Sequence, residues 1–118
     1  MHIMKQKIKL FKKEEGFVRK ITDSFSVLNL LTSQDSDKVS VAVGTAVDHY
    51  ETTEPSGDRA YFILEGKMIV NKNIIGNVGD VVFASAKTTY QFEGTFKAVI
   101  INSPPFRKKE ENITEIKK

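Results

Sequence analysis

Turn-forming residues divide this chain into short segments, and this punctuation constrains the fold more than any other feature. Clusters of Gly, Pro, Asn, Asp and Ser recur at residues 16, 33–37, 55–58, 66, 71–73, 76, 79–80, 94 and 104–105. The segments between them are rich in β-branched and aromatic residues, and they cover 38–48, 60–66, 67–70, 81–84 and 96–102. In the first segment Val39, Val41 and Val43 alternate with small or polar residues, which is the period of a strand. Many short strands separated by turns predict an all-β sandwich or barrel.

Helix is expected to be scarce. Residues 24–32 are the fairest candidate within the fold, but their Val, Phe and Ser content favours a strand. The charged segment 108–118 places Ile113 and Ile116 three residues apart, which allows one or two helical turns at most. We therefore expect this segment to be a tail.

A chain of 118 residues fits a single domain. We expect one β-barrel domain over residues 1–106, in which N-terminal strands in 5–32 flank a barrel core at 38–106. A charged tail would follow at 107–118. The chain has no Cys, which excludes disulfides, thiolate metal sites and Cys nucleophiles. It shows neither a long apolar run nor the pattern of a secretory signal, so we expect a cytoplasmic protein with no membrane partner.

The positive charge lies at the two ends of the chain. Residues 1–20 contain seven Lys or Arg against two Glu, whereas residues 21–106 contain six basic against ten acidic residues. A nucleic-acid-binding domain usually carries a basic stripe on its folded face, often with aromatic residues between the charges. The middle of this chain has neither, so we expect no nucleic-acid partner.

Two segments carry a resemblance to a known family. Residues 58–70 read DRAYFILEGKMIV and residues 78–92 read VGDVVFASAKTTYQF. Together they resemble the two motifs of the cupin superfamily, and the most specific pieces are YFILEG at 61–66 and GDVV at 79–82. The resemblance implies a cupin-type double-stranded β-helix, an RmlC-like jelly-roll barrel with its ligand site inside. The turns agree with this, because Gly66 and the Asn-Lys-Asn at 71–73 suit sharp reversals of the chain.

The residues at the family's metal-binding positions depart from its pattern. By this resemblance Arg59 occupies the place of the ligand Glu, and Tyr90 that of the third His. The pair of His ligands falls at Tyr50 and Thr52, or, with the register shifted by one, at His49 and Glu51. A guanidinium cannot ligate a cation, and a phenol is a poor ligand near neutral pH. We therefore predict no metal site, and we predict no cofactor.

A polar pocket is expected to replace the metal. Strand alternation places Arg59 and Tyr61 on one face, and the resemblance implies that this face lines the barrel. The predicted catalytic residues are His49, as a base, and Tyr90, as a proton donor. The ligand-binding residues, which could hold an anionic or hydroxylated molecule, are predicted to be Arg59, Tyr61, Glu51 and Phe92.

Each assignment has a structural alternative. His49 could be a loop residue, Arg59 could pair at the surface with Asp58 or Glu54, and Tyr61 could be core filler. Tyr90 could also be structural, and Glu51 could be a solvated carboxylate. A Ser-His-Asp triad is not expected, because the one plausible His lies far from any Ser in a recognisable motif.

Three functions remain open from the sequence. The first is a cupin that binds a small polar or anionic molecule in its barrel without a metal. The second is a metal-independent enzyme similar to the cupin-type sugar-nucleotide isomerases and epimerases. The third is a structural or accessory protein in a larger assembly, like the degenerate cupins associated with ethanolamine utilisation. The orientation of His49 separates the enzyme from the others, since a base must point into the barrel and meet a carboxylate.

We also expect a homodimer. The N-terminal segment carries six apolar residues that a lone barrel would leave in water: Ile8, Leu10, Phe11, Phe17, Val18 and Ile21. In cupins such strands often add to the sheet of the partner, which buries apolar surface and satisfies edge hydrogen bonds together.

Overall fold

A computed structural model describes residues 8–107 and 112–115, the last four by their backbone only. The described residues form nine strands and a single turn of 3-10 helix, η1, at Lys13–Glu15, and they contain no α-helix. The all-β prediction is therefore confirmed. The strands are β1 (Phe17–Thr22), β2 (Phe25–Leu31), β3 (Ser40–Glu54), β4 (Asp58–Gly66), β5 (Met68–Val70), β6 (Ile74–Gly76), β7 (Val81–Ala84), β8 (Tyr90–Ser103) and β9 (Asn112–Glu115).

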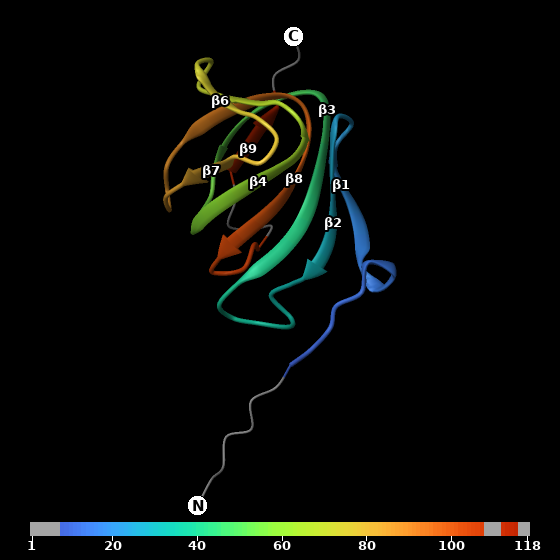
Figure 1. Cartoon of the computed structure of the whole chain (residues 1–118). Coiled ribbons are helices and arrows are strands. Elements are labelled where there is room, and N and C mark those ends of the chain that lie inside the picture. Colours follow the sequence, from blue (N-terminus) through green and yellow to red (C-terminus); the bar gives the residue numbers. More distant parts are fainter. Residues whose placement is uncertain (1–7, 108–111, 116–118) are drawn as a thin grey trace, which may run out of the picture.

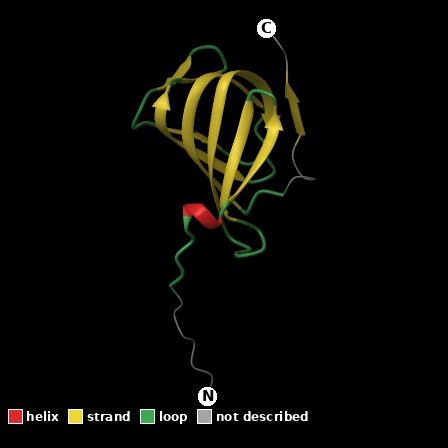
Figure 2. Cartoon of the chain, turned by 90° about the vertical axis from the view of Figure 1, so that its right-hand side faces the viewer, coloured by secondary structure: helices red, strands yellow, loops and turns green. Residues whose placement is uncertain are grey.

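The strands pair throughout in the antiparallel sense and curl into a barrel (Figure 1). The main order is β1-β2-β3-β8-β4-β7, while β5 pairs with β6 and β8, and β9 pairs with β3. The two long strands, β3 and β8, run side by side through both walls of the barrel (Figure 1), and the curvature of the sheet is also seen from the side (Figure 2). Their first pairing region, 40–46 with 96–102, lies in the six-stranded wall, and their second, 49–53 with 90–94, lies in the opposite wall.

The long strands bend where they pass from one wall to the other. The register of β3 against β8 shifts between Ala46 and His49, and Asp48 adopts a left-handed φ of 48°. Opposite this point Gly94 of β8 has φ 125°, and a Cβ there would lie 2.5 Å from the carbonyl oxygen of Lys67. Only glycine fits such a position. The bend brings His49 and the residues after it into the barrel interior.

Two of the expected turns have the predicted backbone. Gly66, which ends β4, has φ 77°, as expected for a glycine at a sharp reversal. Asn71 and Lys72, between β5 and β6, have φ 49° and 69°. The short strand β6 was not predicted, and its pairing with β5 makes a hairpin that covers one end of the barrel.

Two segments for which a helix was considered contain strands instead. Residues 25–31 form strand β2, as their composition favoured. Residues 112–115 form β9 and pair with Glu51–Glu54 of β3, so the expected tail contains a strand. Residues 108–111 and 116–118 of that tail lie outside the described residues.

The core fills the barrel interior. Its buried apolar residues come from both walls and include Phe25, Tyr61, Ile63, Met68 and Phe92. The buried polar or charged residues among those described are Ser40, His49, Glu51, Thr53, Arg59 and Asn102. No helix within the described ranges is long and apolar enough to cross a membrane.

Candidate functional site

All six predicted site residues point into the barrel. Strand β3 contributes His49 and Glu51 just after its bend, and their exposed fractions are 1% and 2%. Strand β4 contributes Arg59 and Tyr61, at 7% and 1%, which agrees with the alternation predicted for that strand. Tyr90 and Phe92 of β8 complete the set, and both are buried. The surface and loop alternatives considered for His49, Glu51 and Arg59 are therefore wrong.

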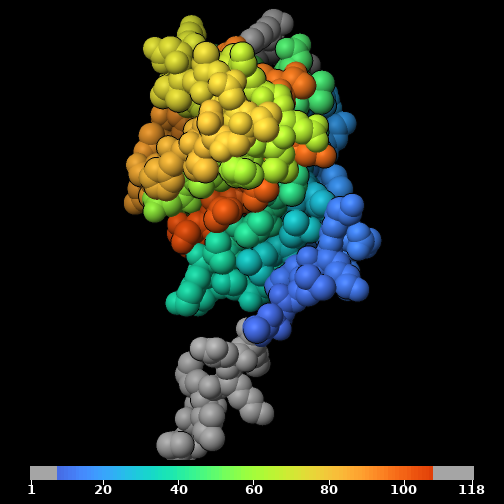
Figure 3. Space-filling model, viewed as in Figure 1, coloured from blue at the N-terminus to red at the C-terminus, as the bar shows by residue number. Residues whose placement is uncertain are grey.

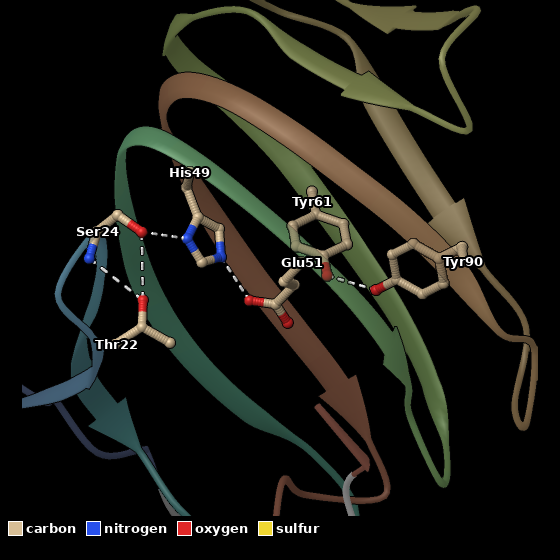
Figure 4. Close-up of polar contacts among 6 residues, drawn as sticks. All are labelled: Thr22, Ser24, His49, Glu51, Tyr61 and Tyr90. Carbon is tan, nitrogen blue, oxygen red and sulfur yellow. Dashed lines mark hydrogen bonds and ion pairs between the residues drawn. The ribbon is translucent and has the colours of Figure 1, made fainter. Parts of the chain in front are cut away.

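His49 and Glu51 form a buried pair. The Nε2 atom of His49 lies 2.6 Å from Oε1 of Glu51, and neither side chain reaches solvent appreciably. The other ring nitrogen, Nδ1, lies 2.6 Å from the Oγ atom of Ser24 (Figure 4). An ionised carboxylate only accepts hydrogen bonds, so Nε2 of a neutral imidazole donates to Glu51 and Nδ1 accepts from the Ser24 hydroxyl. Both ring nitrogens are held, which fixes the plane of the imidazole.

Sequence reasoning missed Ser24, which lies in no recognisable motif. Ser24 lies in the turn between β1 and β2, where its backbone oxygen accepts a hydrogen bond from Val47 at 2.9 Å. The register of β2 on β3 pairs Phe25 with Ala46, so the turn reaches the bend of β3 next to His49. The only available signal was the pairing of the segments 24–32 and 38–48, because no local motif marks Ser24.

Two tyrosines lie near the His49–Glu51 pair: Tyr61 of β4 comes from the facing wall, and Tyr90 of β8 comes from the same wall as the pair. The hydroxyls of Tyr61 and Tyr90 are hydrogen-bonded to each other. Burial raises the pKa of both phenols, and the nearby Arg59 guanidinium offsets only part of that rise. The carboxylate of Glu51 adds to the increase in the pKa of Tyr61. Both phenols therefore stay protonated at neutral pH and can donate a hydrogen bond or a proton.

Arg59 lies at the end of this group that opens towards solvent. Its Nε donates to Oδ1 of Asn102 at 2.5 Å, and its guanidinium carbon lies 5.8 Å from the centre of the Phe106 ring. Arg19 approaches the same ring from β1, at 4.8 Å. The Asp58 carboxylate, one proposed surface partner of Arg59, instead accepts the backbone N–H of Ala86 at 2.8 Å. Two arginines thus converge on one phenylalanine at this mouth of the barrel.

A small pocket of about 70 Å³ opens at this mouth. Arg59, Asn102 and Ser40 provide polar groups, and Phe25, Val27 and Ile100 provide much of the apolar wall. A wider cleft lined by Arg19, Asn29, Phe106 and Arg107 continues from it towards solvent. The ring of Phe25 stacks on that of His49 with 5.0 Å between ring centres, so Phe25 stands between this pocket and the His49–Glu51 pair.

Phe92 occupies the centre of an aromatic cluster. Its ring centre lies 5.4 Å from that of His49, 5.9 Å from that of Tyr61 and 6.1 Å from that of Tyr90. These separations are typical of packed aromatic side chains in a core. Phe92 therefore holds the polar residues apart and in place.

The residues at the family's metal positions do not fit a metal ion. A metal in this position would meet the permanent charge of Arg59 and a phenol, Tyr90, whose raised pKa keeps it protonated. The Nε2 atom of His49 and the Oε1 atom of Glu51 are hydrogen-bonded to each other. Within the described residues, no group of three or more His, Cys, Asp or Glu side chains is placed to hold a metal ion.

The comparisons with known proteins give the fold. No protein-family model matches the chain, and no curated protein sequence matches it either. Solved structures do. A Tyr-to-Phe variant of Streptomyces PAC13 with uridine has TM-score 0.75 and 14% identity, over 94% of this chain and 93% of that one. KdgF from a Halomonas species has TM-score 0.71 and 12% identity, over 87% and 99%. An ethanolamine utilization protein Q from Salmonella typhimurium has TM-score 0.60 and 18% identity, over 70% and 71%.

An RmlC-like cupin protein from Ralstonia eutropha has TM-score 0.70 and 9% identity, over 92% of this chain and 80% of that one. The chain therefore has a cupin fold, as its two motifs predicted. The similar proteins have different activities, so the fold alone assigns none. Pac13 is described as a nucleoside dehydratase. Its structures with uridine include two Tyr-to-Phe variants and one His-to-Gln variant. One histidine and two tyrosines are also the side-chain types that this chain gathers inside its barrel.

Proposed function

We propose that this protein is a metal-independent acid–base enzyme that acts on a small anionic, hydroxylated molecule bound in the barrel. The observation that carries the proposal is the buried His49–Glu51 pair, which faces two protonated phenols. A proton acceptor and a proton donor close to each other are what an elimination or an isomerisation needs. Pac13, which is described as a nucleoside dehydratase and has been studied with substituted His and Tyr residues, supports the same class of reaction.

The roles follow from the order of the side chains. Glu51 lies between His49 and Tyr61 (Figure 4). The His49–Glu51 pair is the base in this arrangement, and it accepts a proton from a carbon of the substrate. Ser24 holds the imidazole from behind. Tyr61 and Tyr90 donate a hydrogen bond to the oxygen that gains charge, or a proton to the hydroxyl that leaves. In an isomerisation the His49–Glu51 pair returns the proton to another carbon of the substrate. In an elimination the C–H and C–O bonds break as the C=C bond and water form, the pair releases its proton to solvent, and the tyrosine that protonated the leaving hydroxyl takes up a proton from solvent.

Arg59 would bind the anionic group of the substrate. It lines the pocket, and it also interacts electrostatically with both tyrosines, so a carboxylate or phosphate held there lies next to the phenols. Guanidinium groups bind such anions through two parallel hydrogen bonds. Phe25 has to shift for the substrate to reach the His49–Glu51 pair, because its ring covers the imidazole.

A second candidate function is binding without catalysis, as in a sensor. It is favoured by the pocket itself, whose lining contains Arg59 and stops at Phe25 before His49. In that case the His49–Glu51 pair would be a structural element of the core. Both candidates share the anionic ligand and differ only in proton transfer.

Calorimetry tests the shared part of the proposal. Uridine 5′-phosphate serves as an anionic, hydroxylated probe, and uridine as its uncharged counterpart. We expect the phosphate to bind more tightly, and Arg59→Gln to weaken its binding at least tenfold while circular dichroism shows an intact fold. The exposed Lys38→Gln is the control and should bind like the unsubstituted protein. Equal binding by Arg59→Gln would contradict the assignment of the anion to Arg59.

Proton nuclear magnetic resonance in D2O tests catalysis. Exchange of carbon-bound hydrogen, or loss of water, is followed over sugar acids, sugar phosphates and nucleoside phosphates. We expect a reaction with at least one of them, which His49→Gln, Glu51→Gln and Tyr90→Phe each slow about a hundredfold or more. If no probe that binds undergoes exchange, the binding function replaces the enzymatic one.

A further inference from the structure

The outer surface of the six-stranded wall is apolar across its full width. Following the strand register from β1 to β7, one row of outward side chains contains Val18, Leu28, Val43, Val99, Phe62 and Val81. Each of these is the direct cross-strand partner of the next. A parallel row beside it contains Val41, Ile101, Ala60 and Phe83. We call these ten residues the outer apolar face.

Several of these side chains are largely open to solvent. The exposed fractions are 70% for Val18, 62% for both Val81 and Phe83, 42% for Phe62 and 39% for Ile101. The strands that carry them follow one another across the side of the molecule seen in Figure 3. An antiparallel sheet that faces water on one side normally alternates apolar and polar residues, with the polar ones outward. Here both faces of the wall are apolar.

Polar rows border the outer apolar face on both sides. Beyond the first row the register places Lys20, Ser26, Thr45, Lys97 and Glu65. Beyond the second row it places Asp58 opposite Ser103. An apolar centre with a polar rim is the arrangement of protein–protein interfaces. We propose that this face is the interface of a homodimer, in which the occupant is a second copy of the same chain.

The size of the face fits a second copy. The first apolar row crosses six strands and the second crosses four, about 4.8 Å apart, and each row covers about 7 Å along the strands, so the apolar centre measures roughly 330 Å². With the polar residues on both sides included, the flat area rises to roughly 550 Å², close to the 600 Å² or so that each partner contributes to the smallest stable interfaces. The apolar centre is as large as the largest patch that typical soluble monomers expose, and such patches often have a function.

The charges at the rim select one orientation of the two copies. A two-fold axis parallel to the strands places Val43 of one copy against Val99 of the other, and Lys20 near Glu65. An axis perpendicular to the strands would instead bring Glu65 near Asp58, which is unfavourable. Both axes join apolar to apolar residues in a self-complementary contact, but only the first places positive near negative residues.

This interface differs from the one expected from the sequence. The N-terminal residues Ile8 and Leu10 are exposed, but they precede the first strand and lie outside the outer apolar face. In the proposed dimer the partners pack face to face through sheet surfaces, as in a β-sandwich, and not by adding a strand to the partner's edge. The barrel mouth at Arg59 is on the inner side of the wall, so the dimer leaves it open.

Sedimentation velocity of the full chain tests the proposal. At 50 μM we expect a species of twice the chain mass. Phe62→Lys should convert it to a monomer, because one lysine from each copy would be buried at the centre of the interface. Ile75→Lys, at an equally exposed apolar residue of β6 away from the face, should remain dimeric. Leu10→Lys should also remain dimeric.

Exchanging the charges of two rim residues tests the interface without placing a charge in its apolar centre, so a failure to fold does not decide the result. Lys20→Glu and Glu65→Lys should each weaken the dimer by about threefold to tenfold, and the double variant should regain most of that loss. A monomeric unsubstituted protein, or a dimeric Phe62→Lys, would overturn the proposal. Dissociation by Leu10→Lys alone would assign the contact to the N-terminal segment instead, and would equally overturn it.

Discussion

The two buried tyrosines make the stability of the fold depend on alkaline pH. Burial raises the pKa of Tyr61 and Tyr90 above 10, whereas both phenols regain their ordinary pKa in the unfolded chain. Below pH 10 the folded and the unfolded state both hold the two phenol protons, so these groups do not lower the free energy of unfolding there. Above pH 10 the unfolded state loses them first, so the free energy of unfolding should fall by about 1.4 kcal/mol per pH unit for each tyrosine.

Urea unfolding between pH 9 and pH 11.5 measures this dependence. Tyr61→Phe and Tyr90→Phe should each reduce the slope by about half, which separates these phenols from the lysines that titrate in the same range. Absorbance of the tyrosinate ion gives a direct check, since the chain has three tyrosines and two should ionise only as the protein unfolds. If the slope in both Phe variants equals that of the unsubstituted protein, neither phenol is the source.

Single residues could be placed correctly where the period of a strand fixed their side. Arg59, Tyr61 and Ile63 are two apart in one strand, so a single inward residue determines the others. Ser24 could not be found this way, because its contact with His49 depends on how one hairpin meets the bend of another strand. Which nitrogen of His49 meets which partner likewise depends on the three-dimensional arrangement.

The bend in β8 is the element on which the position of the site depends. Without it, the strand that carries Phe96 and Ile100 in one wall could not bring Tyr90 and Phe92 to the other. We predict that Gly94→Ala lowers the free energy of unfolding by roughly 3 kcal/mol, since its φ of 125° is accessible essentially to glycine only and a Cβ would meet Lys67.

Gly79→Ala is the matched control for that prediction. Gly79 also has a left-handed φ, of 92°, but a Cβ there would meet nothing within 4 Å. Its substitution should lower the free energy of unfolding by only about 1–2 kcal/mol, the penalty of the backbone alone. Urea unfolding of both variants gives the comparison, and equal losses would contradict the role given to the contact with Lys67.

At the level of elements, the sequence predicted the strands that carry a strong period or composition. Segments 81–84 and 96–102 lie within strands, because Val, Ile and Phe concentrate there. The extension of β3 to Glu54 was not predicted, since Asp48 to Glu54 is polar and its partners are distant in sequence. Strand β9 was missed for the same reason, because its pairing with β3 and not its own composition makes it a strand.

At the level of the whole molecule, the two motifs predicted the fold, whereas the outer apolar face was not recognised. The alternation of Val39, Val41 and Val43 with small or polar residues predicts a strand but does not say which side faces the core. In the structure the small residues between them, such as Ala42 and Gly44, face the core, and the valines face outward. A small residue inside a narrow barrel leaves room for large neighbours, here Phe25 and Ile100 beside Gly44.

The stability of the whole molecule should therefore depend on its concentration. If the folded form is a dimer and the unfolded form a monomer, each tenfold rise in protein concentration adds about 1.4 kcal/mol to the apparent free energy of unfolding per dimer. Between 1 and 100 μM the urea midpoint should rise by a few tenths of a molar or more, given the usual dependence of small proteins on urea. Phe62→Lys should have the same midpoint at both concentrations, and so act as the internal control. A midpoint that does not change in the unsubstituted protein would mean that the barrel unfolds as a monomer and that its outer apolar face is left in water.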